Sequence, residues 1–338
     1  MARKDRRNAG AAADAITMSA IRIELKSRRP LAIGLMSGTS HDGVSAAVVE
    51  LDERARPPAV VRAFRTFAYP AKFRARLLEA SAGKPLGTGA ISALHFELGR
   101  ELARAALRIA REARVPMRKI AFIGSHGHTM FHLPPRTARR GETASTLQLG
   151  EPAVIAALTG VPVVADFRPM DIALGGEGAP LAPLAHLWLF AHPRLGRVVQ
   201  NIGGIANATF IPAGAGIGNS SVIAFDTGPG NGLIDALAAQ QSGERMRMDR
   251  DGRMAARGQV SDALLASLMR GRYFRRRPPK STGREEFGPD YLERAGREAR
   301  RLRVAGDDLI ATITALTARS IADAYRRFIV PRGRVDEL

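Results

Sequence analysis

The sequence predicts an α/β fold organised in two halves. Apolar runs of strand length alternate with longer segments in which apolar residues recur every three or four positions, the pattern of strands alternating with helices. Each half of the chain begins with an apolar run that leads into a glycine-rich polar loop. With 338 residues, the chain is long enough to bury two hydrophobic cores.

The elements of the first half are predicted from this alternation of patterns. They are, in order, strand–loop–strand at 31–53, a third strand at 59–69, helices from 71 to about 113, a buried strand that ends in a polar loop at 119–129, and strand–helix–strand at 146–167. We expect the last of these strands to end at Asp166.

The second half repeats the opening of the first. We expect strand–loop–strand at 197–213, then a strand, a glycine-proline turn and a helix starting near Gly232 within 221–243, and arginine-rich helices up to about 330. The repeated opening predicts two related halves around a cleft.

Composition excludes several classes of protein. There is no cysteine, which excludes a disulfide scaffold, a thiolate metal site and a cysteine nucleophile. No apolar run approaches the length of a membrane span, and the basic segment 1–29 lacks the apolar core of a signal peptide, so no membrane partner is expected. We expect residues 1–29 to form a flexible extension.

The formal net charge of +19, from 51 basic and 32 acidic residues, has two interpretations. One is nucleic-acid binding through phosphate neutralisation. The other is an arginine-rich bias spread over solvated surfaces. We favour the bias because aromatic residues do not alternate with basic ones as stacking platforms. Non-specific attraction to polyanions is expected, but no specific nucleic-acid partner.

The segment GLMSGTSHDG at 34–43 favours phosphate binding. Glycine lets a backbone approach a phosphate closely, and consecutive N–H groups form an anion-binding concavity. Asp42 suits such a loop only if a metal ion or a transferred group needs it. The alternative is a hairpin with a wide turn.

A second candidate, AFDTGPGNGLIDAL, places Asp226 at the end of an apolar strand, before a helix. A helix N-terminus favours anions, and a carboxylate beside an anion site is often a general base. The alternative is that Asp226 acts as a turn or capping residue.

Two further polar segments fit a ligand pocket. The loop after 163–165 gathers Asp166, Arg168, Asp171 and Glu177 and can grip a polar ligand such as a sugar, with Arg168 binding a carboxylate. A long loop with internal ion pairs is the alternative. For the three histidines of GSHGHTMFH (His126, His128 and His132) we favour hydrogen bonding in a polar pocket over a metal site.

Together these segments resemble the 1,6-anhydro-N-acetylmuramic acid kinases, bacterial sugar kinases of the actin–hexokinase–Hsp70 superfamily. The resemblance covers about residues 31–338 and rests on GLMSGTSHDG, IGSHGHT, LQLGEPAVIAALTGVPVVADFRPMDIALGGEGAPLAP, NIGGIAN, FDTGPGN and PKSTGREEFG, in that order. It implies a two-domain, actin-like ATPase fold, ribonuclease-H-like, with a central cleft. We expect the domains at 30–195 and 196–338.

The resemblance implies a cytoplasmic enzyme of peptidoglycan recycling that uses ATP, Mg²⁺ and a small sugar substrate. In the implied reaction, water attacks the anomeric carbon of 1,6-anhydro-N-acetylmuramic acid while the freed 6-oxygen takes the γ-phosphoryl group. Asp226 matches the family's catalytic base, and Asp166 or Asp171 is the alternative. A homodimer is also suggested by the family.

The resemblance also assigns binding residues. ATP is expected to contact Gly38, Thr39, Ser40, His41, Asp42, Gly43, Val44, Ser45, Gly203, Gly204 and Asn207. Asp42 is expected to hold Mg²⁺ through water. The expected sugar-side residues are His126, Thr129, Arg168, Asp171, Gly228 and Asn231.

This chain departs from the family pattern at several positions. The family usually has an aliphatic residue at the position of His41, an acid at that of Ser45, and glutamine at those of His128 and Glu177. In the family a strand and a glycine-rich, adenosine-contacting segment follow the helix that ends near Phe328, whereas this chain stops at Leu338. We therefore expect a truncated C-terminal part and lower stability. A catalytically silent, sugar-binding remnant is the alternative to an active kinase.

Overall fold

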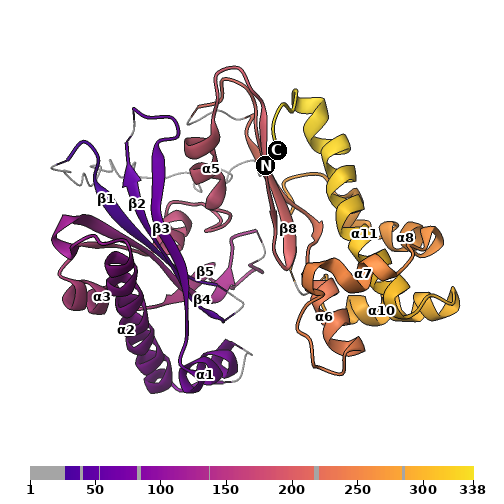
Figure 1. Ribbon diagram of the computed structural model, residues 1–338, viewed down its shortest axis with the longest axis horizontal. Coiled ribbons are helices and arrows are strands. Elements are labelled where there is room, and N and C mark those ends of the chain that lie inside the picture. The colour runs from indigo at the N-terminus through magenta and orange to yellow at the C-terminus, as the bar shows by residue number, and fades with distance from the viewer. Residues whose placement is uncertain are drawn as a thin grey trace, which may run out of the picture.

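The computed structural model describes residues 27–38, 41–52, 54–81, 85–136, 138–216, 221–283 and 286–338. Along these residues, helices and strands alternate and build two separate β-sheets (Figure 1). The α/β class predicted from the alternation is confirmed. Most of the expected flexible extension, residues 1–26, lies outside the described residues.

The first sheet begins with an antiparallel meander and adds a parallel strand beside its first member. The meander consists of β1 (Leu31–Ser37), β2 (Gly43–Leu51) and β3 (Ala59–Ala68). Outside β1 the sheet continues with β4 (Ile120–Leu133), parallel to β1, and β5 (Ser145–Leu149), antiparallel to β4. The short β6 (Val163–Val164) pairs with β4 in parallel. The predicted strand–loop–strand and third strand are confirmed.

Helix α2 (Thr88–Glu112) packs on the first three strands and holds them in place. Its residues Leu94, Leu98, Leu102 and Ile109 recur at helical spacing on one face, and all are at most 3% exposed. Burying each of these side chains stabilises the fold by about 1.5–3 kcal/mol. Two shorter helices, α1 (Ala71–Ser81) and α3 (Pro152–Thr159), complete this half.

The second sheet repeats the meander with β7 (Arg197–Ile202), β8 (Ile205–Ile211) and β9 (Ile223–Pro229). Near the C-terminus the Val198 N–H donates to the Glu337 carbonyl at 3.0 Å, in a parallel bridge between Arg197 and Glu337. A segment parallel to the first strand therefore lies beside both meanders. The predicted likeness of the two halves is visible in this strand arrangement.

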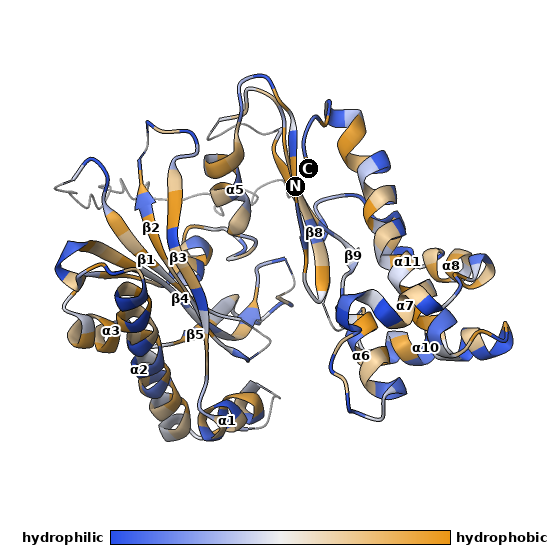
Figure 2. Cartoon of the chain, viewed as in Figure 1, coloured by the Kyte–Doolittle hydropathy of each residue, from blue (hydrophilic) through white to orange (hydrophobic). Residues whose placement is uncertain are grey.

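The remaining helices join the sheets and cover the second one. They are α4 (Phe167–Ala173), α5 (Ala182–Phe190), α6 (Gly232–Gln241), α7 (Arg253–Arg257), α8 (Asp262–Met269), α9 (Arg272–Arg275), α10 (Pro289–Arg301) and α11 (Gly306–Ala324). α11 packs against β9, and Figure 2 shows hydrophobic residues along the strands of this sheet. None of the helices in the described ranges is long and apolar enough to cross a membrane.

Four local predictions were wrong. β4 runs unbroken through 124–133, so the expected polar loop is strand, and Gly127 (φ +66°) lies at a register irregularity of the β1–β4 pairing. Arg168 and Asp171 lie on helix α4 and not on a loop, and the strand before them ends at Val164 instead of Asp166. Asp226 lies within β9 and not at its end.

Candidate active site

The loop between β1 and β2 is a tight turn fixed by close packing. The His41 N–H donates to the Gly38 carbonyl at 3.2 Å, and His41 adopts the left-handed region with φ of 56°. A Cβ at Gly43 would lie 2.1 Å from the Phe67 carbonyl oxygen, so only glycine fits. Thr39 and Ser40, the two hydroxyl residues expected to contact phosphate, lie outside the described residues.

Arg74 of α1 fastens this loop to the first half. Its Nε donates to the His41 carbonyl at 2.9 Å, and its guanidinium lies 3.5 Å from the Asp42 carboxylate. The Asp42 side chain remains 65% exposed. Within the described part of the chain, no group of three His, Asp or Glu side chains gathers to hold a metal ion.

The side chains of Val44 and Ser45 point away from the turn. Val44 is buried in the core of the first half, so only its backbone can face a ligand. Ser45 shares a hydrogen bond of 3.0 Å with Thr66 on β3. Ser45, which makes this cross-strand bond, stands at the position where the family usually has an acidic residue.

The second glycine hairpin is held from behind by the turn after β9. The N–H groups of Gly230 and Gly232 donate to the Gly204 carbonyl, and the Asn231 N–H donates to the Gly203 carbonyl at 2.7 Å. A Cβ at Gly230 would lie 2.1 Å from the Gly203 carbonyl oxygen. NIGGIAN and FDTGPGN, which are distant in the sequence, therefore form one backbone-locked unit.

Three predicted side chains or backbone positions belong to this unit. The Asn231 side chain donates to the Ile202 carbonyl at 3.1 Å, next to the hairpin. Asn207 pairs with Asp226 across β8 and β9, and its carbonyl accepts from Gln200. Gly228 is closely packed, because a Cβ there would lie 2.9 Å from the Ser320 hydroxyl oxygen.

Three hydrogen bonds from outside its own sheet help to position Asp226. Its carboxylate accepts from the Thr282 N–H at 2.8 Å, its N–H donates to the Lys280 carbonyl at 3.1 Å, and its carbonyl accepts from the Tyr273 hydroxyl at 2.8 Å. Helix α6 begins at Gly232, as predicted, so Asp226 is too far along the chain to cap it. The capping alternative is wrong.

Histidine and arginine form a polar cluster on the first half. Arg168 Nε donates to His126 Nε2 at 2.9 Å, and His126 Nδ1 lies 3.2 Å from the Gly127 carbonyl. The neutral tautomer with its proton on Nδ1 satisfies both contacts. Burial, followed by the Arg168 charge, lowers the pKa of His126, although its bond to Gly127 opposes this.

Asp171 completes this cluster through the glycine segment after α4. Its carboxylate accepts from the Gly178 N–H at 2.7 Å, while the Gly178 carbonyl accepts from Arg168 at 2.9 Å. A Cβ at Gly176 would lie 2.2 Å from the same carboxylate. Three of the predicted sugar-side residues, His126, Arg168 and Asp171, are thus brought together.

The neighbouring residues of β4 face different partners. Thr129 accepts a long hydrogen bond, 3.4 Å, from Gln148, and His132 lies 3.2 Å from the Thr146 hydroxyl. The prediction that these histidines act as hydrogen-bond partners is confirmed. Glu177 forms an ion pair of 3.2 Å with Arg136, which follows β4 and lies outside the loop of Glu177, so this is not the ion pair within the loop that the alternative expected.

His128 belongs to a buried network that the sequence did not reveal. The Tyr69 hydroxyl donates to Ser37 Oγ at 2.6 Å, and Ser37 lies 2.8 Å from His128 Nδ1. The His41 ring is 4.8 Å from the His128 ring. Burial, with repulsion from His41, lowers the pKa of His128 to about 4. His41 and His128, both departures from the family pattern, are therefore in contact.

Sequence reasoning also missed Tyr273 and Thr282, which hold Asp226. PKSTGREEFG was recognised as a family segment, but nothing in its composition indicated that its backbone runs alongside β9. Asp166, an alternative base, adopts φ of 58° immediately before α4. The family resemblance favoured Asp226 over Asp166 as the base.

Comparison with known proteins agrees with these motifs. The model of the family "Anhydro-N-acetylmuramic acid kinase" matches residues 30–334. A relative of that name from Caldanaerobacter subterraneus is 42% identical over 94% of this chain and 80% of its own length. A relative of the same name from Gloeobacter violaceus is 46% identical over 88% of this chain and 77% of its own length.

A solved ROK family glucokinase from Streptomyces griseus aligns with 88% of this chain and 80% of its own, at 14% identity and a TM-score of 0.32, too low to support an argument. The family model spans nine-tenths of the chain, and both relatives are more than 40% identical to it. The chain belongs to the anhydro-N-acetylmuramic acid kinase family of enzymes.

Proposed function

We propose that this protein is an ATP-dependent kinase that converts 1,6-anhydro-N-acetylmuramic acid and water into N-acetylmuramic acid 6-phosphate, within cytoplasmic peptidoglycan recycling. The observation that carries the proposal is the backbone-locked unit of NIGGIAN and FDTGPGN beside Asp226. This unit holds the Asp226 carboxylate and the Gly203–Gly204 hairpin on neighbouring strands. The reaction needs both, because a general base must lie close to the site that binds the transferred phosphoryl group.

Asp226 acts in this proposal as the general base. Its carboxylate takes a proton from water as the water oxygen bonds to the anomeric carbon of the sugar. The bond between that carbon and the 6-oxygen breaks, and the 6-oxygen attacks the γ-phosphorus of ATP, releasing ADP. The Thr282 N–H keeps the carboxylate oriented for this step.

The first loop and the Arg168 cluster bind the two substrates. Gly38–Ser45, together with Gly203 and Gly204, contact the phosphates of ATP, where backbone N–H groups suit an anion. His126, Arg168 and Asp171 bind the sugar, with Thr129, Gly228 and Asn231. The guanidinium of Arg168 matches the carboxylate of the sugar's lactyl group.

Mg²⁺ fits this site as an ion held mostly by phosphate and water. In proteins, Mg²⁺ is usually bound by one or two carboxylates and keeps several of its water ligands. The exposed carboxylate of Asp42 is therefore suited to contact the ion through one of these waters. When bound, Mg²⁺ neutralises charge on the β- and γ-phosphates.

The proposal is tested by sugar-dependent ADP release from the 338-residue chain. Asp226→Asn keeps an oxygen to accept the Thr282 N–H but loses basicity, so turnover should vanish while calorimetry still detects sugar binding. Asp262→Asn, at an exposed residue of helix α8, is the matched control and should retain activity. Equal turnover in Asp226→Asn would remove Asp226 from the role of base. Sugar binding without ADP release in the unmodified chain would instead support the silent-remnant alternative.

A further inference from the structure

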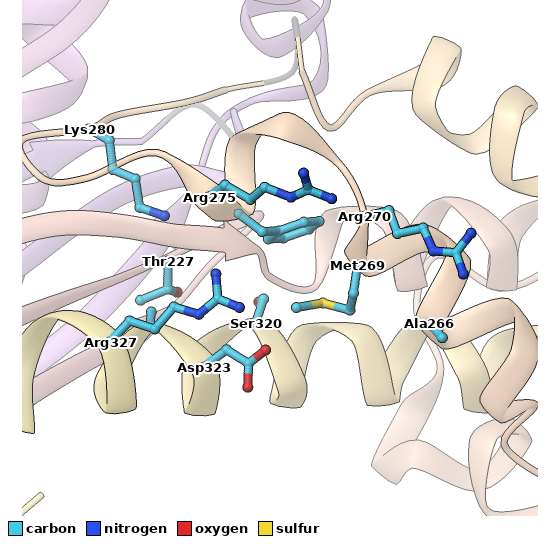
Figure 3. A pocket seen from close by; sticks show the side chains of 11 residues that line it. Thr227, Ala266, Met269, Arg270, Arg275, Lys280, Ser320, Asp323 and Arg327 are labelled. Atoms are coloured by element: carbon cyan, nitrogen blue, oxygen red, sulfur yellow. The ribbon is translucent and has the colours of Figure 1, made fainter.

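A small cavity lies between β9 and α11, with α8 and α9 along its side (Figure 3). Its volume is about 240 Å³. This is below the roughly 300–1,000 Å³ of pockets that hold drug-sized ligands. A ligand that fits here is therefore small.

The cavity is lined by far more positive than negative charge. Its cationic side chains are Arg270, Arg275, Lys280 and Arg327, and its one carboxylate is Asp323. That carboxylate is already paired, at 3.2 Å with Arg319 and 2.9 Å with Arg326. None of the four lining cations has a carboxylate within 4.0 Å among the described residues. The cavity thus carries uncompensated positive charge.

Lys280 is the deepest of these cations. It is only 5% exposed, and its ammonium lies 4.6 Å from the centre of the Tyr273 ring and 5.1 Å from that of Phe328. In the described part of the chain, no acceptor hydrogen-bonds to this ammonium. Aromatic faces compensate a buried ammonium only in part. An anion in the cavity would supply the missing partner.

Burial, together with the charges of Arg276 and Arg327, lowers the pKa of Lys280 to about 8, while the charge of Asp226 opposes this shift. Arg270, Arg275 and the paired Asp323 also line the cavity. An ammonium with this pKa is mostly protonated at neutral pH and can donate to an anion.

The cavity opens on the face of β9 opposite the Asp226 side chain. Thr227 lines the cavity, and consecutive residues of a strand point to opposite faces of the sheet. The Asp226 carboxylate therefore does not face the cavity. Gly228, assigned above to the sugar, packs against Ser320 and Phe274 of the cavity wall, but none of the residues assigned to the sugar or ATP is itself among the lining residues.

We propose that this cavity binds a phosphate group, either free phosphate or the phosphate of a small monoester. Three guanidiniums present planar pairs of N–H donors that match phosphate oxygens, and Lys280 adds a point charge at the base of the cavity. A dianion both fits the small volume and neutralises the surplus charge.

Calorimetric titration of the full chain with inorganic phosphate, and separately with N-acetylglucosamine 6-phosphate, at constant ionic strength tests this site. The double variant Arg275→Gln/Arg327→Gln removes two lining charges and should weaken binding at least tenfold. The matched control Arg272→Gln/Arg277→Gln removes two neighbouring charges that do not line the cavity and should change affinity less than twofold. The tighter of the two probes identifies the source of the phosphate group.

A third variant, Ala266→Phe, fills part of the cavity and leaves every charge in place. It should also abolish binding, and it answers the objection that charge removal alters the fold. Equal affinity in the two double variants would overturn the proposal, because binding would then reflect overall charge or another site. Absence of saturable binding to the unmodified chain would overturn it as well.

Discussion

The two glycine hairpins hold equivalent places in the two meanders but are fixed by different means. The β1–β2 loop is tied down by a side chain, Arg74, and by packing of Gly43 against Phe67. The β7–β8 loop is tied by three backbone hydrogen bonds from the turn at 230–232. The β1–β2 loop can therefore change its conformation when the Arg74 side chain moves. The β7–β8 loop can move only together with β9, the strand that carries Asp226.

The two halves also differ in the titratable group that each of them buries. In the first half, His128 is buried as a neutral acceptor beside Ser37. In the second half, Lys280 is buried as a cation among aromatic rings. Burial favours the uncharged form in both, but over different ranges of pH.

The largest expected effect is from Gly230→Ala. Its Cβ would lie 2.1 Å from the Gly203 carbonyl oxygen, so the hairpin and the β9 turn must separate. We expect a loss of about 1–3 kcal/mol of stability and a fall in turnover of about 10²-fold, because Asp226 is displaced. Thermal melts and the ADP assay measure both. Gly204→Ala, which has open space at its Cβ, should melt close to the unmodified protein, and equal melting of both variants would show that the two motifs are not locked.

The pH dependence of stability distinguishes the buried groups. The folded-state pKa of His128 is about 4, against 6.5 when unperturbed, so the unfolded chain binds more protons between these values. Stability should therefore fall as pH drops from 6.5 towards 4, and His128→Gln should flatten this slope.

The same argument applies to Lys280, whose pKa is lowered from 10.5 to about 8 in the folded protein. Stability should fall as pH drops from 10.5 to 8, and Lys280→Met should flatten this slope. Urea unfolding across pH tests both; unchanged slopes would contradict the burial of these groups.

A smaller effect is expected when the first loop is released. Arg74→Met removes the donor to the His41 carbonyl and the partner of Asp42. A hydrogen bond from a charged group contributes about 1.5–3 kcal/mol, so the melting temperature should fall by a few degrees. Release of the loop should also raise KM for ATP roughly tenfold. Arg76→Met, which removes an ion pair with Glu97 on the same helix, is the control. If both variants behave alike, Arg74 does not position the loop.

The smallest effect is expected from Tyr273→Phe. The variant loses one hydrogen bond to the Asp226 carbonyl and keeps the ring beside Lys280. Stability should fall by about 1 kcal/mol, and the lowered pKa of Lys280 should remain. A chemical titration of lysine reactivity across pH separates the two roles of the ring.

The sequence alone predicted most of the elements and the segments that carry the site. Periodicity identified α2 and the two meanders, because their apolar residues repeat with the period of the helix or strand they form. It failed at β4 and α4, where polar and glycine residues suggested loops. At β4 the strand pairing and the close packing of Gly127 against Leu149 determined the backbone conformation.

Tertiary structure alone decided which motifs meet. The lock between Gly203–Gly204 and Gly230–Gly232, the support of Asp226 by Thr282, and the cations gathered around Lys280 all join segments remote in sequence. Local patterns report the preference of a segment for helix, strand or turn. The pairing of segments depends instead on strand register and close packing, which bring together residues whose spacing along the chain carries no signal.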